Sequence, residues 1–193
     1  YGNIDNQTNL GSTDVVTGKL KWDSFETLWS RHFGTKSTDR SKKIGLDSLN
    51  NVYVTGITEG DFDGKKHLGK EDIFLIKYDS SGLKKWTRQI GSSASDNVED
   101  LYVDSNGNVY IAGGSKGSLD NNSNAGSYDI FLMKFNTSGE KQWTRQWGTS
   151  EGDGAYGIDV DSFGNIYVNG STYGDLDGNT NKGKSDLFLT KYN

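Results

Sequence analysis

The sequence predicts an all-β protein made of four-stranded antiparallel units that stack around a common axis as the blades of a β-propeller. Three observations predict this fold. The sequence repeats itself every 57 residues, each repeat holds short segments rich in Val, Ile, Tyr, Phe and Trp, and no segment has the periodicity of an amphipathic helix. Repeats of about 40–60 residues that contain several short strands are typical of propeller blades.

The repeat is clearest at three tryptophans. Trp29, Trp86 and Trp143 are 57 residues apart and begin the segments WSRHFGT, WTRQIGS and WTRQWGT. The same spacing separates two sets of aspartates, which are Asp39, Asp96 and Asp153, and Asp72, Asp129 and Asp186. A spacing kept by so many different residues defines one structural unit that occurs several times.

Each repeat is predicted to hold four strands, here named A to D. Strand A is KKIGLD, EDLYVD or YGIDVD; strand B is NVYVTG, NVYIAG or NIYVNG; strand C is DIFLIKY, DIFLMKF or DLFLTKY; strand D is KKWTRQI, KQWTRQW or the shorter WSRHF. Asp47, Asp104 and Asp161 begin tight A–B turns and are interpreted as turn formers. Strand A is expected to lie nearest the propeller axis.

A β-sandwich is the alternative fold, but a sandwich needs no constant period. A single blade cannot cover its own two faces, whereas radial stacking of blades buries both of them. We therefore predict a propeller. Residues 1–28 form a partial, divergent blade with strands C and D, residues 29–85 and 86–142 form repeats 1 and 2, and residues 143–193 form repeat 3 without its last strand. All four belong to one propeller domain or a segment of one.

The register of the N-terminal piece is ambiguous in sequence. Residues 1–14 resemble residues 173–186, but residues 15–28 align either through Gly18 and Trp22 or through Trp29. We interpret this piece as a divergent C–D hairpin. The chain thus holds about three and a half blades, whereas closed propellers typically have 4 to 8. We expect either further sequence beyond residues 1 and 193 or ring closure between chains, and favour the longer chain.

The repeated residues closely resemble the bacterial seven-bladed β-propeller repeat family, abbreviated SBBP, over residues 29–193. The matching residues in one repeat are Trp86, Gly91, Asp104, Gly107, Asn108, Tyr110, Gly113, Gly126, Asp129, Phe131 and Lys134. The resemblance implies the propeller fold. It also implies a protein that is exported or attached to the cell surface, and it implies no particular activity.

Composition excludes several classes of function. The chain has no cysteine, which rules out disulfides, thiolate metal sites and a cysteine nucleophile. Its net charge of −5 comes from interspersed charges without a basic block, so we expect no nucleic-acid partner. No apolar run approaches the roughly 20 residues of a membrane-spanning helix, so none is expected.

The loops between strands B and C place oxygen-bearing side chains at alternating positions, as calcium loops do. The candidate ligands are Asp120, Asn122, Asn124 and Asp129 in repeat 2, and Asp177, Asn179, Asn181 and Asp186 in repeat 3. Repeat 1 has Lys65 at such a position and is expected not to bind. Any bound metal should be calcium, with a dissociation constant of about 10⁻⁴–10⁻³ M. The competing interpretation is that the recurring aspartates cap loop turns through backbone N–H groups.

Two further patterns bear on function. Trp86 and Arg88, like Trp143 and Arg145, lie on one face of strand D, where we expect the aromatic ring to pack on the next blade under the arginine stem. The D–A and B–C loops share one end of the ring and form a polar rim suited to carbohydrate or protein.

Catalysis has little support, because His32 and His67 occupy different repeat positions and neither recurs. We therefore predict a non-catalytic extracellular or cell-surface module that binds glycan or protein, or that serves scaffolding and assembly with further copies or the remaining blades. The alternative is a propeller segment of a polysaccharide-acting enzyme whose site lies outside this segment. No catalytic residue is assigned.

Overall fold

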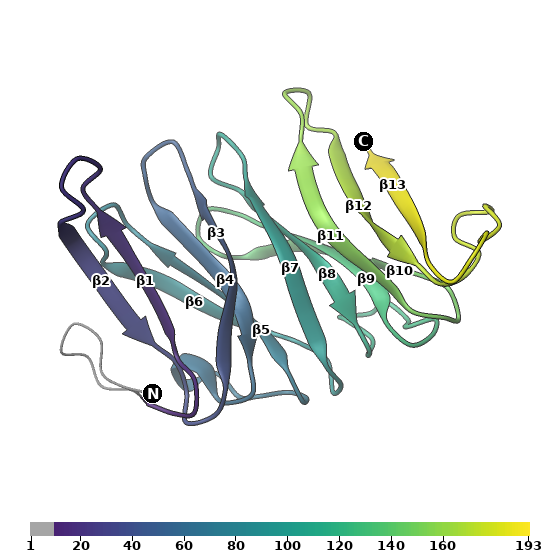
Figure 1. Cartoon of the computed structure of the whole chain (residues 1–193), viewed down its shortest axis with the longest axis horizontal. Coiled ribbons are helices and arrows are strands. Elements are labelled where there is room, and N and C mark those ends of the chain that lie inside the picture. The colour runs from purple at the N-terminus through teal and green to yellow at the C-terminus, as the bar shows by residue number, and fades with distance from the viewer. Residues whose placement is uncertain (1–9) are drawn as a thin grey trace.

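The computed structural model describes residues 10–193, which form four antiparallel β-sheets arranged side by side along an open arc (Figure 1). The first sheet contains β1 (Val15–Leu20) and β2 (Thr27–Phe33). The second contains β3 (Asp39–Leu46), β4 (Val52–Thr58), β5 (Asp72–Tyr78) and β6 (Lys84–Ile90). The third contains β7 (Asp96–Val103), β8 (Val109–Ser115), β9 (Asp129–Phe135) and β10 (Lys141–Trp147). The fourth contains β11 (Asp153–Val160), β12 (Ile166–Thr172) and β13 (Asp186–Tyr192).

The strands follow the predicted order within each sheet. The two full sheets run β3-β4-β5-β6 and β7-β8-β9-β10, with every neighbouring pair antiparallel. Within residues 10–193 the one helical segment is the single turn η1 (Phe62–Gly64), in the B–C loop of the second sheet. The prediction of four-stranded propeller blades without a long helix is therefore confirmed.

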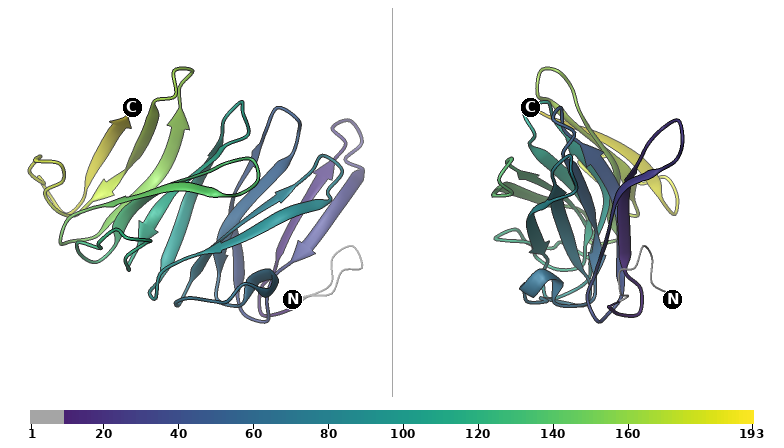
Figure 2. Two further views of the ribbon diagram at one scale, coloured as in Figure 1. Left: turned by 180° about the vertical axis from the view of Figure 1, so that it is seen from behind. Right: turned by 90° about the vertical axis from the view of Figure 1, so that its left-hand side faces the viewer.

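The second, third and fourth sheets meet through strand A of the later sheet at each junction. Strand β7 packs against β3, β4 and β5, and β11 packs against β7, β8 and β9. The four sheets fan out from this line of contact without closing a ring, and β1–β2 and β13 lie at opposite ends of the arc (Figure 2). This is the arrangement expected when strand A lies nearest the axis.

The hydrophobic core consists of layers between sheets. One layer joins Tyr53, Ile73 and Leu75 of the second sheet to Val98 and Leu101 of β7, and all five are buried. Strands β4, β5 and β8 are buried at every position, because each has a sheet on both sides. The apolar residues that alternate along a two-faced strand are thus covered by neighbours on both faces, as a propeller requires.

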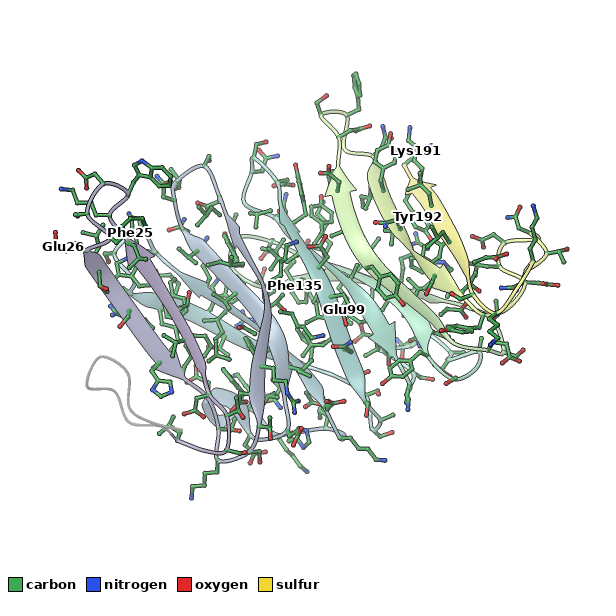
Figure 3. The ribbon with its side chains drawn as sticks, viewed as in Figure 1. Phe25, Glu26, Glu99, Phe135, Lys191 and Tyr192 are labelled. Carbon is green, nitrogen blue, oxygen red and sulfur yellow. The ribbon has the colours of Figure 1, made fainter. Side chains whose placement is uncertain are left out.

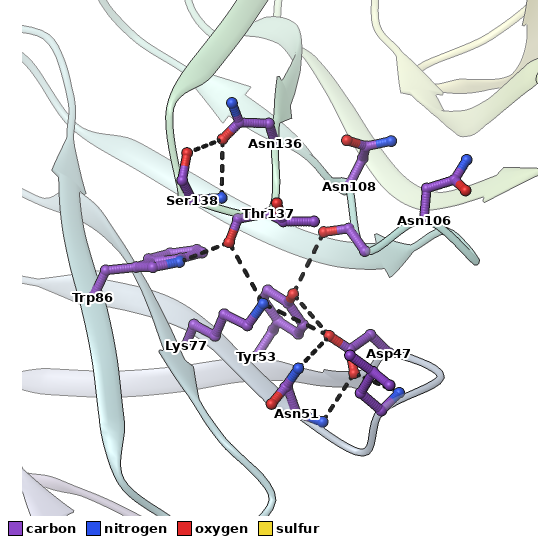
Figure 4. A network of polar contacts seen from close by, with 12 residues as sticks. Asp47, Asn51, Tyr53, Lys77, Trp86, Asn106, Asn108, Asn136, Thr137 and Ser138 are labelled. Atoms are coloured by element: carbon purple, nitrogen blue, oxygen red, sulfur yellow. Dashed lines mark hydrogen bonds and ion pairs between the residues drawn. The ribbon is translucent and has the colours of Figure 1, made fainter.

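The A–B turns are built around one aspartate each. Asp47 Oδ1 accepts the backbone N–H groups of Leu49 and Asn51, and Asp47 Oδ2 accepts the Asn51 amide and the Tyr53 hydroxyl (Figure 4). Asp104 and Asp161 make the corresponding bonds in their own turns. The interpretation of these aspartates as turn formers is confirmed.

These turns also reach the next sheet. The Tyr53 hydroxyl lies 3.4 Å from the carbonyl oxygen of Gly107, in the A–B turn of the third sheet. Lys77 Nζ lies 3.4 Å from the Thr137 carbonyl oxygen and 4.9 Å from the centre of the Tyr53 ring (Figure 4). A single network therefore joins the turns of two successive sheets at this end of the molecule.

A tryptophan and an arginine of strand D hold the C–D turn of the following sheet. Trp86 Nε1 donates to the Thr137 carbonyl at 3.1 Å, and Arg88 Nε donates to the Gly139 carbonyl at 2.6 Å. The Arg88 guanidinium carbon lies 5.3 Å from the centre of the Trp86 ring. Gly139 has a φ of +77°, and a Cβ there would come within 2.8 Å of the indole. We call this arrangement the Trp–Arg clamp, and it confirms that the pair packs on the next blade.

The clamp also resolves the register of the N-terminal hairpin. Trp29 Nε1 donates to the Ser80 carbonyl at 3.3 Å and Arg31 Nε donates to the Gly82 carbonyl at 2.7 Å, repeating the contacts of Trp86 and Arg88. Trp22 is instead 90% exposed. The structural alignment therefore runs through Trp29, and the divergent C–D hairpin is β1 and β2.

Buried carboxylates form a second contact between sheets. The first residue of strand C and the first residue of the next strand A are both aspartates, and their side chains meet beside a glycine. A Cβ on Gly148 would lie 2.9 Å from Asp129 Oδ1 and 2.8 Å from Asp153 Oδ2. The equivalent pairs are Asp14 with Asp39 beside Gly34, and Asp72 with Asp96 beside Gly91. Only glycine leaves room for both carboxylates.

Burial and mutual repulsion act on these pairs together. Asp129 is 0% exposed and Asp153 3%, and Oδ1 of each is buried without a hydrogen-bond partner among the described residues. Burial raises the pKa of Asp129, and the nearby charge of Asp153 raises it further. Burial and the paired carboxylate likewise raise the pKa of Asp39 and of Asp96. Protonation of one aspartate of a pair therefore removes the electrostatic repulsion between the two carboxylates at that junction.

Replacing Arg88 by Ala should destabilise the protein by about 1–2 kcal/mol, because it removes hydrogen bonds from a charged donor to the turn of the next sheet. Arg145→Ala is the matched control. Arg145 is exposed, and the described chain contains no C–D turn after β13 for it to hold. Thermal unfolding should show a lower melting temperature for Arg88→Ala alone; equal shifts for both variants would refute the clamp's role.

Asp129→Asn should change how stability depends on pH. A carboxyl whose pKa is raised on folding binds its proton more tightly in the folded state, so its contribution is favourable at low pH and is lost as pH rises above about 4. The variant should therefore gain stability relative to the wild type between pH 4 and neutrality. Denaturant unfolding across this range measures the difference.

Asp47→Asn serves as the control with the opposite sign. Burial alone would raise the pKa of Asp47, but hydrogen bonds from Asn51 and Tyr53 outweigh it and lower the pKa. Its favourable contribution is present above the unfolded pKa, so this variant should lose stability relative to the wild type as pH rises. Parallel curves for both variants would contradict the assignment of the buried pair.

Candidate functional site

One end of the molecule gathers the B–C and D–A loops of neighbouring sheets, as predicted. Glu71, before β5, forms a β-bridge with Ser95, before β7, and Thr13 forms the equivalent bridge with Thr38. Gly69 and Gly126 in the B–C loops allow this close approach, since a Cβ at Gly69 would come within 2.1 Å of the Ala94 carbonyl oxygen. The rim of this end is therefore made by two loops from different sheets.

The closing aspartate of each B–C loop caps the loop backbone. Asp129 Oδ2 accepts the N–H of Ala125 at 2.7 Å, and Asp186 Oδ2 accepts that of Lys182 at 2.7 Å. Asp14 and Asp72 make the same bond to the residue four positions earlier. The turn-capping role is thus present in all four copies.

The predicted calcium ligands are not gathered at one point in this geometry. Asp120 binds the Lys141 ammonium and the Thr144 hydroxyl of strand β10. The side-chain amides of Asn122 and Asn124 donate to the carbonyls of Leu119 and Ser115. Asp129 lies with Asp153 at the sheet junction. The structure therefore assigns these side chains to loop and junction contacts.

The B–C loop of the fourth sheet makes the same kind of internal contacts. The Asn179 and Asn181 amides donate to the carbonyls of Leu176 and Thr172, and Asp177 is exposed. In residues 10–193, no three or more His, Asp or Glu side chains form a group arranged to hold a metal. Calcium binding by either loop stays a prediction, which calorimetric titration with Asp129→Ala and Asp186→Ala as controls would test.

The most distinctive concave surface lies between the third and fourth sheets. It is a cleft of about 360 Å³ that includes the rings of Tyr128, Tyr156 and Tyr173. Its polar wall holds Asn97, Glu99 and Ser171. Tyr156 and Tyr173 are 58% and 56% exposed, whereas most aromatic side chains among residues 10–193 are buried or half-buried. We call this surface the tyrosine cleft.

Each strand A contains a β-bulge, which turns one residue toward the place at the junction between sheets where the tyrosine cleft lies. The bulged residues are Lys42 in β3, Glu99 in β7 and Tyr156 in β11. Bulges commonly redirect a side chain next to a functional site. The Tyr156 hydroxyl lies 2.9 Å from Ser171 Oγ, which fixes the ring across β11 and β12. Figure 3 places Glu99 in the middle of the arc, on β7.

Polar and charged groups lie beside the tyrosines of the cleft. Asn97 donates its amide N–H to Glu99, and Asn97 Oδ1 is buried without a hydrogen-bond partner among the described residues. Glu99 also accepts from Lys42 Nζ at 3.0 Å. Lys116 Nζ lies 4.8 Å from the centre of the Tyr128 ring, and burial raises the pKa of the Tyr128 hydroxyl. Donors, acceptors and aromatic surfaces therefore meet in one place.

The preceding junction has different chemistry at the same positions. Between the second and third sheets, the positions of Asn97, Tyr128 and Tyr156 are held by Arg40, Glu71 and Glu99. Arg40 Nη1 lies 3.8 Å from Glu71 Oε1 and 3.5 Å from Glu59 Oε1. Ion pairs occupy that junction, whereas the later junction carries tyrosines and an open cleft.

The tyrosine cleft was not predicted from sequence. The predictions followed residues that recur, whereas Tyr128 and Tyr156 are departures from the repeat. A signal was nevertheless present, because three aromatic residues replace charged residues at the equivalent positions of one junction. The residues predicted from the repeat, the aspartates and asparagines, form the framework around the cleft.

No helix within residues 10–193 has the length and apolar character needed to cross a membrane. Two known proteins are similar to this chain. The regulatory protein FlaEY of Caulobacter vibrioides is 31% identical over 176 residues, which cover 82% of this chain and 18% of that protein. The uncharacterized WD repeat-containing protein L264 of Acanthamoeba polyphaga mimivirus is 26% identical over 207 residues, covering 87% of this chain and 15% of that protein.

The chain thus spans less than a fifth of the length of either relative. The model of the SBBP β-propeller repeat matches residues 28–63, 85–120 and 142–177. Each match runs from strand D through the following strands A and B into the B–C loop, which is the segment that contains both the tryptophan and arginine of the clamp and the buried aspartate of strand A. This chain therefore belongs to the SBBP family of β-propeller repeat proteins.

Proposed function

We propose that this chain is a non-catalytic binding module that works outside the cell or at the cell surface and takes a glycan in the tyrosine cleft. The observation that carries the proposal is the replacement of ion pairs by exposed tyrosines at one junction of an otherwise repetitive structure. A repeat module that served only as a spacer would have no need of this local difference.

The chemistry of the cleft suits a sugar ring. Aromatic faces pack on the apolar C–H faces of a sugar, while amide, carboxylate and hydroxyl groups bond to its hydroxyls. Tyr156 and Tyr173 supply exposed aromatic surface, and Glu99 lines the polar wall beside them. A volume of about 360 Å³ is within the range of small-ligand sites.

Tyr156→Ala and Tyr173→Ala should each weaken glycan binding by about five- to tenfold, because each removes one aromatic contact worth roughly 1–1.5 kcal/mol. A glycan array identifies the ligand, and titration calorimetry with the best ligand measures the loss. Phe163→Ala is the matched control, since Phe163 is 90% exposed in an A–B turn at the opposite end of β11. Melting temperatures should stay close to that of the wild type.

A screen for glycan hydrolysis in the same samples should find no turnover. Release of reducing sugar that depends on Glu99 or Asp153 would overturn the non-catalytic assignment. Binding that is equally strong in the Tyr156→Ala, Tyr173→Ala and Phe163→Ala variants would remove the cleft as the site. A protein ligand that competes with the glycan, and is lost in the two tyrosine variants, would leave the site in place and correct the ligand class.

A further inference from the structure

We propose that the glycan taken by the tyrosine cleft carries an ammonium group, as an unacetylated amino sugar does, and that Glu99 and the tyrosine faces select this group. The inference rests on the proposed function, because it names the chemical class of the ligand for the same cleft. It follows from the charges at this junction, from the contacts of Glu99 and from the tyrosine rings that have no cation over them.

The cleft has lost the positive charges of the preceding junction. At five equivalent positions the preceding junction holds Arg40, Lys42, Lys116, Glu71 and Glu99, and the cleft junction holds Asn97, Glu99, Tyr173, Tyr128 and Tyr156. The first set contains three cations and two carboxylates, whereas the second contains one carboxylate and no cation. A ligand that brings its own positive charge therefore supplies what side chains supply at the preceding junction.

The preceding junction also shows how a cation meets this carboxylate. Lys42 and Glu99 are the bulged residues of β3 and β7, and Lys42 Nζ lies 3.0 Å from Glu99 Oε1. At the cleft junction the bulged residues are Glu99 and Tyr156, so an aromatic ring stands where the preceding junction has a second charge. An ammonium group between the carboxylate and the ring is attracted by both.

Glu99 can hold a second cation. Both of its contacts, with Lys42 Nζ and with the Asn97 amide, are made by Oε1, and neither uses Oε2. The side chains of Lys42 and Glu99 are 30% and 29% exposed, so water weakens their attraction. A ligand ammonium can therefore bind Oε2 and compete with Lys42 for the carboxylate.

Lysine ammonium groups lie over tyrosine rings at several places in this protein. The distances from Nζ to the ring centre are 4.8 to 5.5 Å, for Lys77 over Tyr53, Lys116 over Tyr128, Lys134 over Tyr110 and Lys191 over Tyr167. Among residues 10–193, Tyr156 and Tyr173 have no lysine or arginine over their rings, although both are more than half exposed. Their faces are available to the cation of a ligand.

The buried aspartates of the junction favour the same sign of ligand charge. Asp153 lines the cleft and lies beside Asp129. When the two share one proton, one negative charge stays in a buried place where salt screens it poorly. Lys116 acts in the opposite direction, but it lies over Tyr128 and does not line the cleft. A uronic acid would therefore be repelled, and an N-acetylated sugar would leave Glu99 without a ligand cation.

Calorimetric titration of the 193-residue chain with two oligosaccharides of equal length tests the inference. The probes are a glucosamine tetramer and an N-acetylglucosamine tetramer, at a mildly acidic pH where the amine is protonated. The glucosamine tetramer should bind about tenfold more tightly, because a carboxylate and aromatic faces hold its cation. Glu99→Gln should abolish this preference. Lys42→Met should increase it, because Lys42 competes with the ligand for the carboxylate.

Glu59→Gln is the matched control for Glu99→Gln. Glu59 lies 3.5 Å from Arg40 at the preceding junction and does not line the cleft, so this variant changes the net charge equally without touching the site. It should keep the preference for the glucosamine tetramer. An equal loss of preference in both variants would mean that the cationic oligomer is attracted non-specifically to a protein with a net charge of −5, and would overturn the inference.

The same titrations separate a failure of the inference from a failure of the proposed function. Equal affinity of the two tetramers for the wild type, with both weakened in Tyr156→Ala, would leave glycan binding in the cleft and overturn the choice of an amino sugar. Tighter binding of an oligogalacturonate than of the glucosamine tetramer would overturn it as well. If the wild type binds no glycan at all, the proposed function fails and the inference fails with it.

Discussion

Every sheet of this protein depends on its neighbours to cover two apolar faces. A single four-stranded sheet with apolar residues on both sides cannot fold alone in water, because both of its apolar faces would stay exposed. The layer that includes Ile73, Leu75 and Val98 is therefore the central interaction of the structure. The clamp, the turn networks and the carboxylate pairs all lie at the same junctions. They fix the angle and register at which the apolar layers meet.

The repeat made most of the fold predictable. Strong periodicity defined the unit, and the alternation of aromatic and β-branched residues defined its strands, so strand order and sheet composition followed directly. The clamp was foreseen as packing of Trp86 and Arg88, but its hydrogen bonds to carbonyls of the next turn depend on a geometry that only the assembled sheets show. The pairing of Asp129 with Asp153 was missed for the same reason, since 24 residues separate them in sequence.

The candidate site could not be predicted in the same way. Repetition identifies what every unit needs for folding, whereas a site can reside in what a single unit changes. Asp120 recurs because strand D needs a partner for its lysine and threonine, and this structural need produced the alternating oxygens that resemble a metal loop. Tyr156 does not recur, and its position in the cleft depends on a bulge in β11. That bulge could not be predicted from the sequence.

The Trp–Arg clamp gives the row of sheets a direction. Trp86 and Arg88 reach forward to the turn of the following sheet, and among residues 10–193 no equivalent pair reaches back. The two ends of any such row are therefore chemically different: one presents an indole and a guanidinium, the other a turn with carbonyl acceptors. Contacts of this head-to-tail kind are heterologous, so rows of sheets can join in only one orientation. Such a row closes into a ring only when the tryptophan and arginine of its last sheet reach the C–D turn of its first sheet. The angle between neighbouring sheets therefore determines how many sheets the closed ring contains.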